Sequence, residues 1–115
     1  MFNFENLNIY QESLNYSSLV YKITRSWPKD ELFGLTNQIR RAAVSITLNI
    51  AEGSSRTKKD FRHFLDQARG SCYETVAVVT TAKKLSYITE TEFLSIYETA
   101  NRLSRMINAL KNSLK

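Results

Sequence analysis

The segment from Gln38 to Arg56 most constrains how this chain can fold, because it reads as a helix with apolar residues on two opposite sides. One set has the three-and-four spacing that is typical of a helix face packed on a core: Leu35, Ile39, Ala42, Ala43, Ile46 and Ile50. Val44, Leu48 and Ala51 lie on the opposite side. We therefore expect one side of this helix to face its own core and the other to face another protein surface.

Polar residues of the same segment form a narrow row between its two apolar sides: Gln38, Arg41, Ser45, Asn49 and Glu52. Arg40 is expected on the outward side near the helix start. Asn49 borders the core side, so we expect it to be partly buried and its amide to need partners. A buried Asn or an Arg–Glu pair can fix helix register and oligomer geometry, which favours a structural role over a binding pocket.

Hydrophobic periodicity and helix stop signals predict four helices. Their expected ranges are Asn6–Arg25, Leu35–Ser54, Thr57–Ser86 and a last helix that follows Thr89. Two adjacent apolar stripes are expected on the first helix. One consists of Leu7, Tyr10, Leu14 and Tyr21, and the other of Ile9, Tyr16, Val20 and Ile23. Capping boxes are indicated at Thr57 and Thr89. The fold class is therefore all-α, an antiparallel up-down-up-down four-helix bundle formed by one domain of residues 1–115.

Two glycines carry more specific predictions. Gly53 is expected to end the second helix by taking the left-handed position after its last turn. Gly70 lies inside the third helix, where a glycine is tolerated and favours a close approach of a neighbouring helix.

Composition limits where the protein can act. No apolar run reaches the length of about 18 residues that a membrane span needs, and the N-terminus lacks the pattern of a signal peptide. The single cysteine, Cys72, cannot form an internal disulfide, which fits a reducing compartment. We therefore expect a cytoplasmic protein with no membrane partner.

Charge is the second informative property, since the chain has a formal net charge of +5. Much of the excess lies between Arg40 and Arg69. In an antiparallel bundle, Arg56, Lys58, Lys59 and Arg62 would surround one end, together with His63. A polyanion could bind there. The alternative is an ordinary solvated helix start, although cations at a helix N-terminus oppose the helix dipole.

Residues for catalysis or for metal binding are scarce. His63 is the only histidine, with Asp60 and Asp66 at helical spacing on either side. No nucleophile or set of metal ligands is marked as its partner, and Cys72 lies on an apolar stripe as a small core residue. We expect no enzymatic activity, no catalytic residue, no cofactor and no bound metal.

Several segments together resemble a known bacterial family. The run GLTNQIRRAAVSITLNIAEGSSR, followed by FRHFLDQARGSCYET and AKKLSYI, is similar to the four-helix-bundle proteins encoded in intervening sequences of 23S ribosomal RNA genes. The same fold is similar to the accessory variability protein of diversity-generating retroelements, a basic pentamer that associates with a reverse transcriptase and nucleic acid. The resemblance implies a homopentamer. It matches Arg40 and Arg41 to a basic pair of the family, and Asn49, Glu52, Gly53 and Arg56 to its NIAEG-x-x-R segment. Thr47 and Leu48 replace a proline and a small residue that members often carry.

The sequence therefore predicts a non-enzymatic homo-oligomer that binds RNA or DNA, or a nucleic-acid-bound protein partner such as a reverse transcriptase, through phosphate contacts. The residues predicted to bind nucleic acid are Arg40, Arg41, Arg56, Lys58, Lys59 and Arg62. The residues predicted at the oligomer interface are Val44, Leu48 and Ala51. The alternative that remains is a protein–protein assembly scaffold with no nucleic-acid role.

Overall fold

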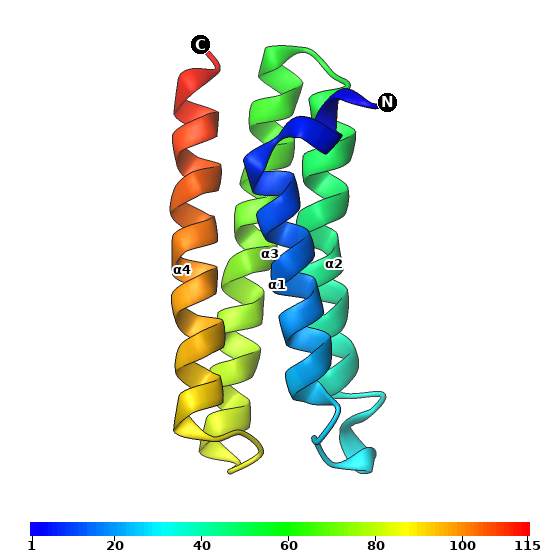
Figure 1. Cartoon of the computed structure of the whole chain (residues 1–115), viewed down its shortest axis with the longest axis vertical. Coiled ribbons are helices and arrows are strands. Elements are labelled where there is room, and N and C mark those ends of the chain that lie inside the picture. The colour runs from blue at the N-terminus through cyan, green and yellow to red at the C-terminus, as the bar shows by residue number, and fades with distance from the viewer.

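Four long helices account for most of the chain in the computed structural model, which describes all 115 residues. They are α1 (Asn8–Thr24), α2 (Leu35–Ser54), α3 (Lys58–Lys84) and α4 (Glu90–Ser113), with short 3₁₀ turns η1 (Asn3–Asn6) and η2 (Lys29–Glu31) before α1 and α2. The helices run up and down in turn, and the molecule measures 43 Å along its long axis (Figure 1). The predicted antiparallel four-helix bundle is confirmed.

Each helix packs against two neighbours in the ring α1–α2–α3–α4, and α4 closes the ring against α1. The most extensive contact joins α2 to α3, and the least extensive joins α1 to α4. The core is continuous along the bundle and contains Ile46, Leu65, Ile96 and Leu103, all at most 1% exposed. The predicted core side of α2 is confirmed, with Leu35 half-buried at its start and the other five residues buried.

Polar groups inside the bundle are paired across helices. The buried hydroxyl of Tyr16 on α1 lies 2.7 Å from Oγ1 of Thr75 on α3, and Thr75 donates its own proton to the Cys72 carbonyl at 2.6 Å. Thr47 on α2 donates to Oγ of Ser13 on α1 at 2.9 Å. These bonds satisfy groups that would otherwise be costly to bury, and they fix how α1 sits on α2 and α3.

Both predicted helix starts after the loops are confirmed by their caps. Oγ1 of Thr57 accepts a hydrogen bond from the Asp60 amide at 3.2 Å but lacks the reciprocal bond of the predicted capping box, whereas Thr89 forms a complete capping box with Glu92. Helix α1 begins two residues later than predicted, at Asn8, because residues Asn3–Asn6 turn in a 3₁₀ helix that Leu7 ends in an extended conformation. Helix α3 ends at Lys84 rather than Ser86, whose φ of 65° is incompatible with a continuing helix.

Both glycine predictions are wrong. Gly53 has no positive φ and is a buried residue within α2. A Cβ there would lie 2.6 Å from Cβ of Phe64 and 2.9 Å from Cδ1 of Phe61, so Gly53 is required by the close approach of α3. Gly70 has no neighbouring atom within 4 Å of the corresponding position and permits no close helix contact.

Two residues of the first predicted apolar stripe of α1 point outward instead of into the core. Leu14 and Tyr21 are each 40% exposed, whereas Ile9, Tyr16, Val20 and Ile23 of the second stripe are buried. None of the helices is both long and apolar enough to span a lipid bilayer.

Candidate nucleic-acid interface

Four of the residues predicted to bind nucleic acid meet where α2 turns into α3. Arg56 lies in the turn, Lys58 and Lys59 occupy the first turn of α3 after the Thr57 cap, and Arg62 follows one turn later. All four side chains are exposed. We call these four residues the basic cluster.

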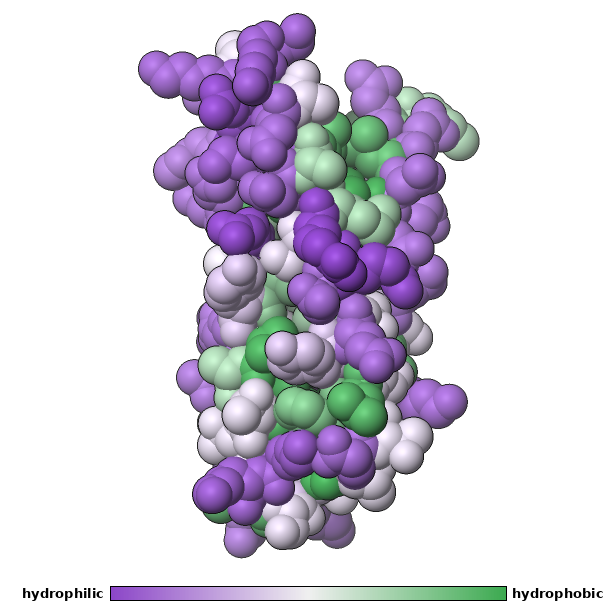
Figure 2. Space-filling view, turned by 90° about the vertical axis from the view of Figure 1, so that its left-hand side faces the viewer, coloured by the Kyte–Doolittle hydropathy of each residue, from purple (hydrophilic) through white to green (hydrophobic).

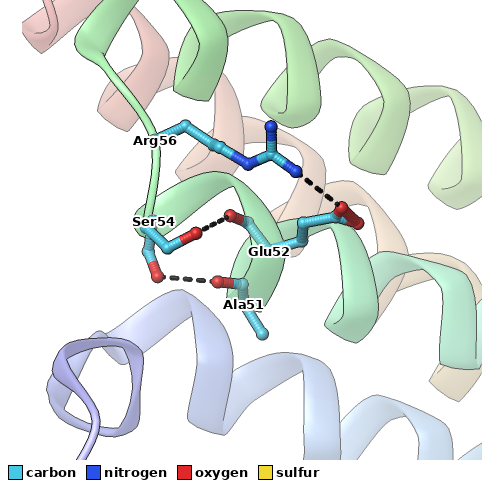
Figure 3. Close-up of polar contacts among 5 residues, drawn as sticks. Ala51, Glu52, Ser54 and Arg56 are labelled. Carbon is cyan, nitrogen blue, oxygen red and sulfur yellow. Dashed lines mark hydrogen bonds and ion pairs between the residues drawn. The ribbon is translucent and has the colours of Figure 1, made fainter.

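Arg56 is the only member of the basic cluster with an ion pair. Its Nη2 lies 3.3 Å from Oε2 of Glu52 on the last turn of α2 (Figure 3), and its guanidinium lies 5.4 Å from the centre of the Phe64 ring. The hydroxyls of Ser54 and Ser55 donate to carbonyls of the same turn and close the end of α2. About half of each charged side chain is exposed, so the ion pair orients Arg56 and adds little stability.

The other three cations of the basic cluster have no carboxylate partner. None of the four ion pairs in the protein includes Lys58, Lys59 or Arg62. Lys58 and Lys59 also lie where the backbone amides of α3 give the helix end a partial positive charge. Apart from the Arg56–Glu52 pair, the cations of the cluster have no ion-pair partner within the chain, and the cluster is therefore a region of positive potential.

Arg40 and Arg41 lie far from the basic cluster. They are near the other end of α2, about 22 Å from Arg56 at a rise of about 1.5 Å per residue. Nε of Arg40 donates to Oγ1 of Thr24 at 2.9 Å, and its guanidinium lies 4.6 Å from the centre of the Tyr21 ring. Arg40 is thus held against α1, half-buried, and only Arg41 is exposed. The structure brings four of the six predicted residues together in one chain.

The predicted interface residues do lie on the outward side of α2. Leu48 is 62% exposed, while Val44 and Ala51 are half-buried. The exposed Leu14 and Tyr21 extend this apolar surface onto the adjoining side of α1, since Tyr21 lies against Arg40 of α2. Near Ala51 the surface meets Phe2 and Phe4 of the N-terminal segment, which line a hollow of about 390 Å³ beside α2. Sequence analysis did not include these aromatic residues in the surface.

The row of polar residues on α2 faces α3. Asn49 is half-buried as predicted, and its Nδ2 donates to the carbonyl and to Oγ of Ser45 at 2.9 and 3.1 Å. Ser71 of α3 donates to the same Oγ at 3.1 Å. Arg41 and Glu52 form no pair with each other, because Glu52 pairs with Arg56. The row therefore links α2 to α3 within the chain.

The residues considered for catalysis are separate in space. His63 is exposed, and its Nε2 lies 3.2 Å from Nε2 of Gln67 rather than near a carboxylate. Asp66 pairs with Lys111 at 2.7 Å. Cys72 is buried and donates to the Ala100 carbonyl at 3.2 Å, and this burial raises the pKa of the thiol to about 11. At neutral pH the thiol is protonated, which makes it a poor nucleophile.

Comparison with known proteins decides the family. The family model described as 23S rRNA-intervening sequence protein matches residues 5–109. The chain belongs to the 23S rRNA-intervening sequence protein family. The match spans the basic cluster, the apolar side of α2, the whole of α1, α2 and α3, and most of α4. The resemblance seen in the sequence is confirmed for this family.

A solved structure supports the fold of the family member. It is the crystal structure of a protein with unknown function from the S23 ribosomal protein family of Bacteroides thetaiotaomicron, with a TM-score of 0.80 and 22% sequence identity. The alignment covers 90% of this chain and 97% of that chain. At this identity the similarity establishes the fold. A search of curated proteins gives no match.

Proposed function

We propose that the protein is a non-enzymatic cytoplasmic homo-oligomer, a pentamer by its resemblance to the retroelement accessory protein, that binds nucleic acid through the basic cluster. The natural target is an RNA or DNA backbone, free or already bound to a protein such as a reverse transcriptase. The cluster supplies charge to phosphates and does not read base edges.

One observation carries this proposal, namely that Lys58, Lys59 and Arg62 are exposed and unpaired at the positive end of a helix. Cations at such an end cost about 0.3–1 kcal/mol each when they interact with the helix dipole alone. A polyanion that binds the three side chains reverses this cost and also meets the free amides of the first turn. Solubility alone would be served equally well by acidic residues at this position.

Oligomerisation is supported by the apolar surface on α1 and α2. A Leu side chain that is 62% exposed, beside Val44, Ala51, Leu14 and Tyr21, forms an apolar strip along the outside of the bundle. Burial of such a strip against a second copy removes apolar area from water at about 25 cal/mol per Å². Several copies would also bring several basic clusters into one assembly and increase avidity for a long polyanion.

The experiment is a salt series of binding to structured RNA and to duplex DNA, with the wild type and a variant that carries Lys58→Gln, Lys59→Gln and Arg62→Gln. We expect weaker binding and a slope of log affinity against log salt that is less steep by about three, since about one counterion is released per phosphate contact. A matched control removes three exposed unpaired cations at the other end of the bundle, Lys22, Arg25 and Lys84.

The control variant should bind like the wild type. Thermal unfolding separates a loss of binding from a loss of fold, because removal of cations from the start of α3 should leave the midpoint unchanged or raise it. If the salt dependence of the cluster variant equals that of the wild type, the basic cluster does not bind nucleic acid.

The second candidate is an assembly scaffold whose partner is another protein, and the exposed Leu48 surface favours it. A pull-down with and without nuclease distinguishes the two functions. A partner that is lost after nuclease treatment supports the nucleic-acid function, and a partner that is retained supports the scaffold.

A further inference from the structure

The positive charge of the basic cluster continues down one side of α3. Lys58, Arg62, Arg69 and Tyr73 follow one another at spacings of four, seven and four residues, so they share one side of the helix. That side faces α4, because Asp66 on the same stripe pairs with Lys111 of α4. The stripe is about 22 Å long at a rise of about 1.5 Å per residue.

A groove between α3 and α4 lies at the lower end of this stripe. It has a volume of about 260 Å³ and is lined by Tyr73 and Val76 of α3 and by Tyr97 and Asn101 of α4. An adjoining hollow of about 330 Å³ shares Tyr73 and Asn101 and continues upward between Arg69 and Arg105. Figure 2 shows the α4 side of the bundle, where hydrophilic side chains gather toward the upper left and apolar ones reach the surface at the upper right and in the lower half.

Two exposed tyrosine rings flank the groove. Tyr73 is 56% exposed and Tyr97 is 44% exposed. Tyr97 stacks on Phe93 with ring centres 5.7 Å apart. The guanidinium of Arg69 lies 4.9 Å from the centre of the Tyr73 ring, and its Nη2 donates to the tyrosine hydroxyl at 2.9 Å. Each ring is therefore supported by a neighbour while part of it stays open to a ligand.

The cations above the rings are not neutralised. Neither Arg69 nor Arg105 forms an ion pair, and Nε of Arg69 is buried without a hydrogen-bond partner. The nearby carboxylate of Asp66 is already paired with Lys111 at 2.7 Å. A buried donor without a partner costs free energy, so the guanidinium of Arg69 is not fully satisfied within the chain.

Exposed aromatic rings in line with unpaired cations suit single-stranded nucleic acid, whose bases stack on the rings while its phosphates meet the cations. A duplex keeps its base faces covered. We propose that the α3–α4 groove binds a single strand, with bases on Tyr73 and Tyr97 and the backbone following Arg69 up to Arg62 and Lys58. The stripe would hold about six nucleotides at a stacked spacing of about 3.4 Å. This inference rests on the proposed nucleic-acid function and adds a strand type and a second set of contacts to it.

The test compares Tyr97→Leu with Tyr97→Phe, because leucine removes the stacking surface and phenylalanine keeps it. The Tyr97 hydroxyl makes no hydrogen bond within the chain, so Tyr97→Phe leaves the fold unchanged. Phe33→Leu is the control for loss of an exposed aromatic ring, since Phe33 is 92% exposed in the connector between η2 and α2 and does not line the groove. Fluorescence anisotropy is measured with a labelled oligouridylate and with a duplex of equal length.

We expect Tyr97→Leu to bind oligouridylate about tenfold more weakly than the wild type and to bind the duplex equally well. Tyr97→Phe and Phe33→Leu should bind both probes as the wild type does. If Tyr97→Leu binds oligouridylate as the wild type does while the basic-cluster variant still loses affinity, the groove does not bind a single strand. That result leaves the proposed function intact. No binding of either probe by the wild type overturns both. A shift of the oligomeric state by Tyr97→Leu at unchanged affinity identifies the groove as a contact between copies and also overturns this inference.

Discussion

Replacement of Gly53 by alanine tests the packing of α2 on α3 directly. The new Cβ would lie 2.6 Å from Cβ of Phe64, an atom that can move only with the backbone of α3. Overpacking of a dense core costs about 1–3 kcal/mol, and the better helix propensity of alanine returns about 1 kcal/mol. We place the cost in the upper part of its range because a backbone-attached atom must shift. Gly53→Ala should then destabilise the protein by about 1–2 kcal/mol, a decrease of about 4–8 °C in Tm for a domain of this length.

Gly70→Ala is the matched control, since the same substitution in α3 meets no atom within 4 Å. Only helix propensity acts there, so Gly70→Ala should stabilise by about 1 kcal/mol. The assay is urea unfolding followed by far-UV circular dichroism and by the fluorescence of Trp27, which is 5% exposed at the opposite end of the bundle. Coincident transitions of the two probes justify a two-state free energy. If Gly53→Ala stabilises the protein as much as Gly70→Ala does, then α3 does not exclude a Cβ at residue 53 and the packing argument is refuted.

Three further substitutions test separate parts of the molecule. Leu48→Glu should reduce assembly to monomers in light scattering, with Leu94→Glu on α4 as the control, and an unchanged oligomer would exclude Leu48 from the interface. Cys72→Ala should reduce the fall of stability between pH 9 and pH 10 by about 1 kcal/mol, because the thiol pKa is raised from 9.0 to about 11 and mainly the unfolded thiol ionises over that interval; an equal slope in urea unfolding would contradict this. Tyr16→Phe should cost about 1 kcal/mol in urea unfolding through loss of its 2.7 Å hydrogen bond to Thr75, and no loss would mean that this bond adds nothing.

Much of the fold could be predicted because the signals that determine it are local. The caps at Thr57 and Thr89 lie within three residues of the amides that they bind. The core sides of α2 and α4 follow helical spacing without interruption, and short loops force successive helices to run antiparallel. Each of these features is decided by residues close together in the sequence.

Gly53 shows where local signals fail. A glycine three residues before Arg56 fits the rule for a left-handed helix end, and the sequence contains nothing nearby to contradict that rule. The actual reason is Phe64 on the next helix, which comes within 2.6 Å of the position of a Cβ. Such a contact between helices depends on how two finished elements pack, and spacing along one element cannot reveal it.

Leu14 and Tyr21 illustrate a related limit. A helix that is apolar over a wide arc has a core side and a second apolar side, and periodicity alone does not indicate which of them is buried. The bundle buries Tyr16 and Val20 and leaves Leu14 and Tyr21 outside, next to the outward side of α2. Both α1 and α2 have a second apolar side that stays outside the core, so the apolar surface extends over two helices rather than one.

The candidate site was predicted from charge, and this explains both what was found and what was missed. Counting cations near a loop identifies Lys58, Lys59 and Arg62 because they are close in sequence, but it also includes Arg40, whose side chain is used to pack against Tyr21. Arg69 contributes to the same excess of charge but is not among the residues predicted to bind nucleic acid, and neither is Tyr73, because only helical spacing connects the two residues to Arg62. Two properties therefore identify an unsatisfied cation on this helix bundle. It lies beside the contact between two helices, and no residue of the neighbouring helix pairs with it. Arg69 has both properties, because it lies beside the contact of α3 with α4 and its Nε has no hydrogen-bond partner. Arg40 lacks the second property, because Thr24 of α1 accepts its Nε–H.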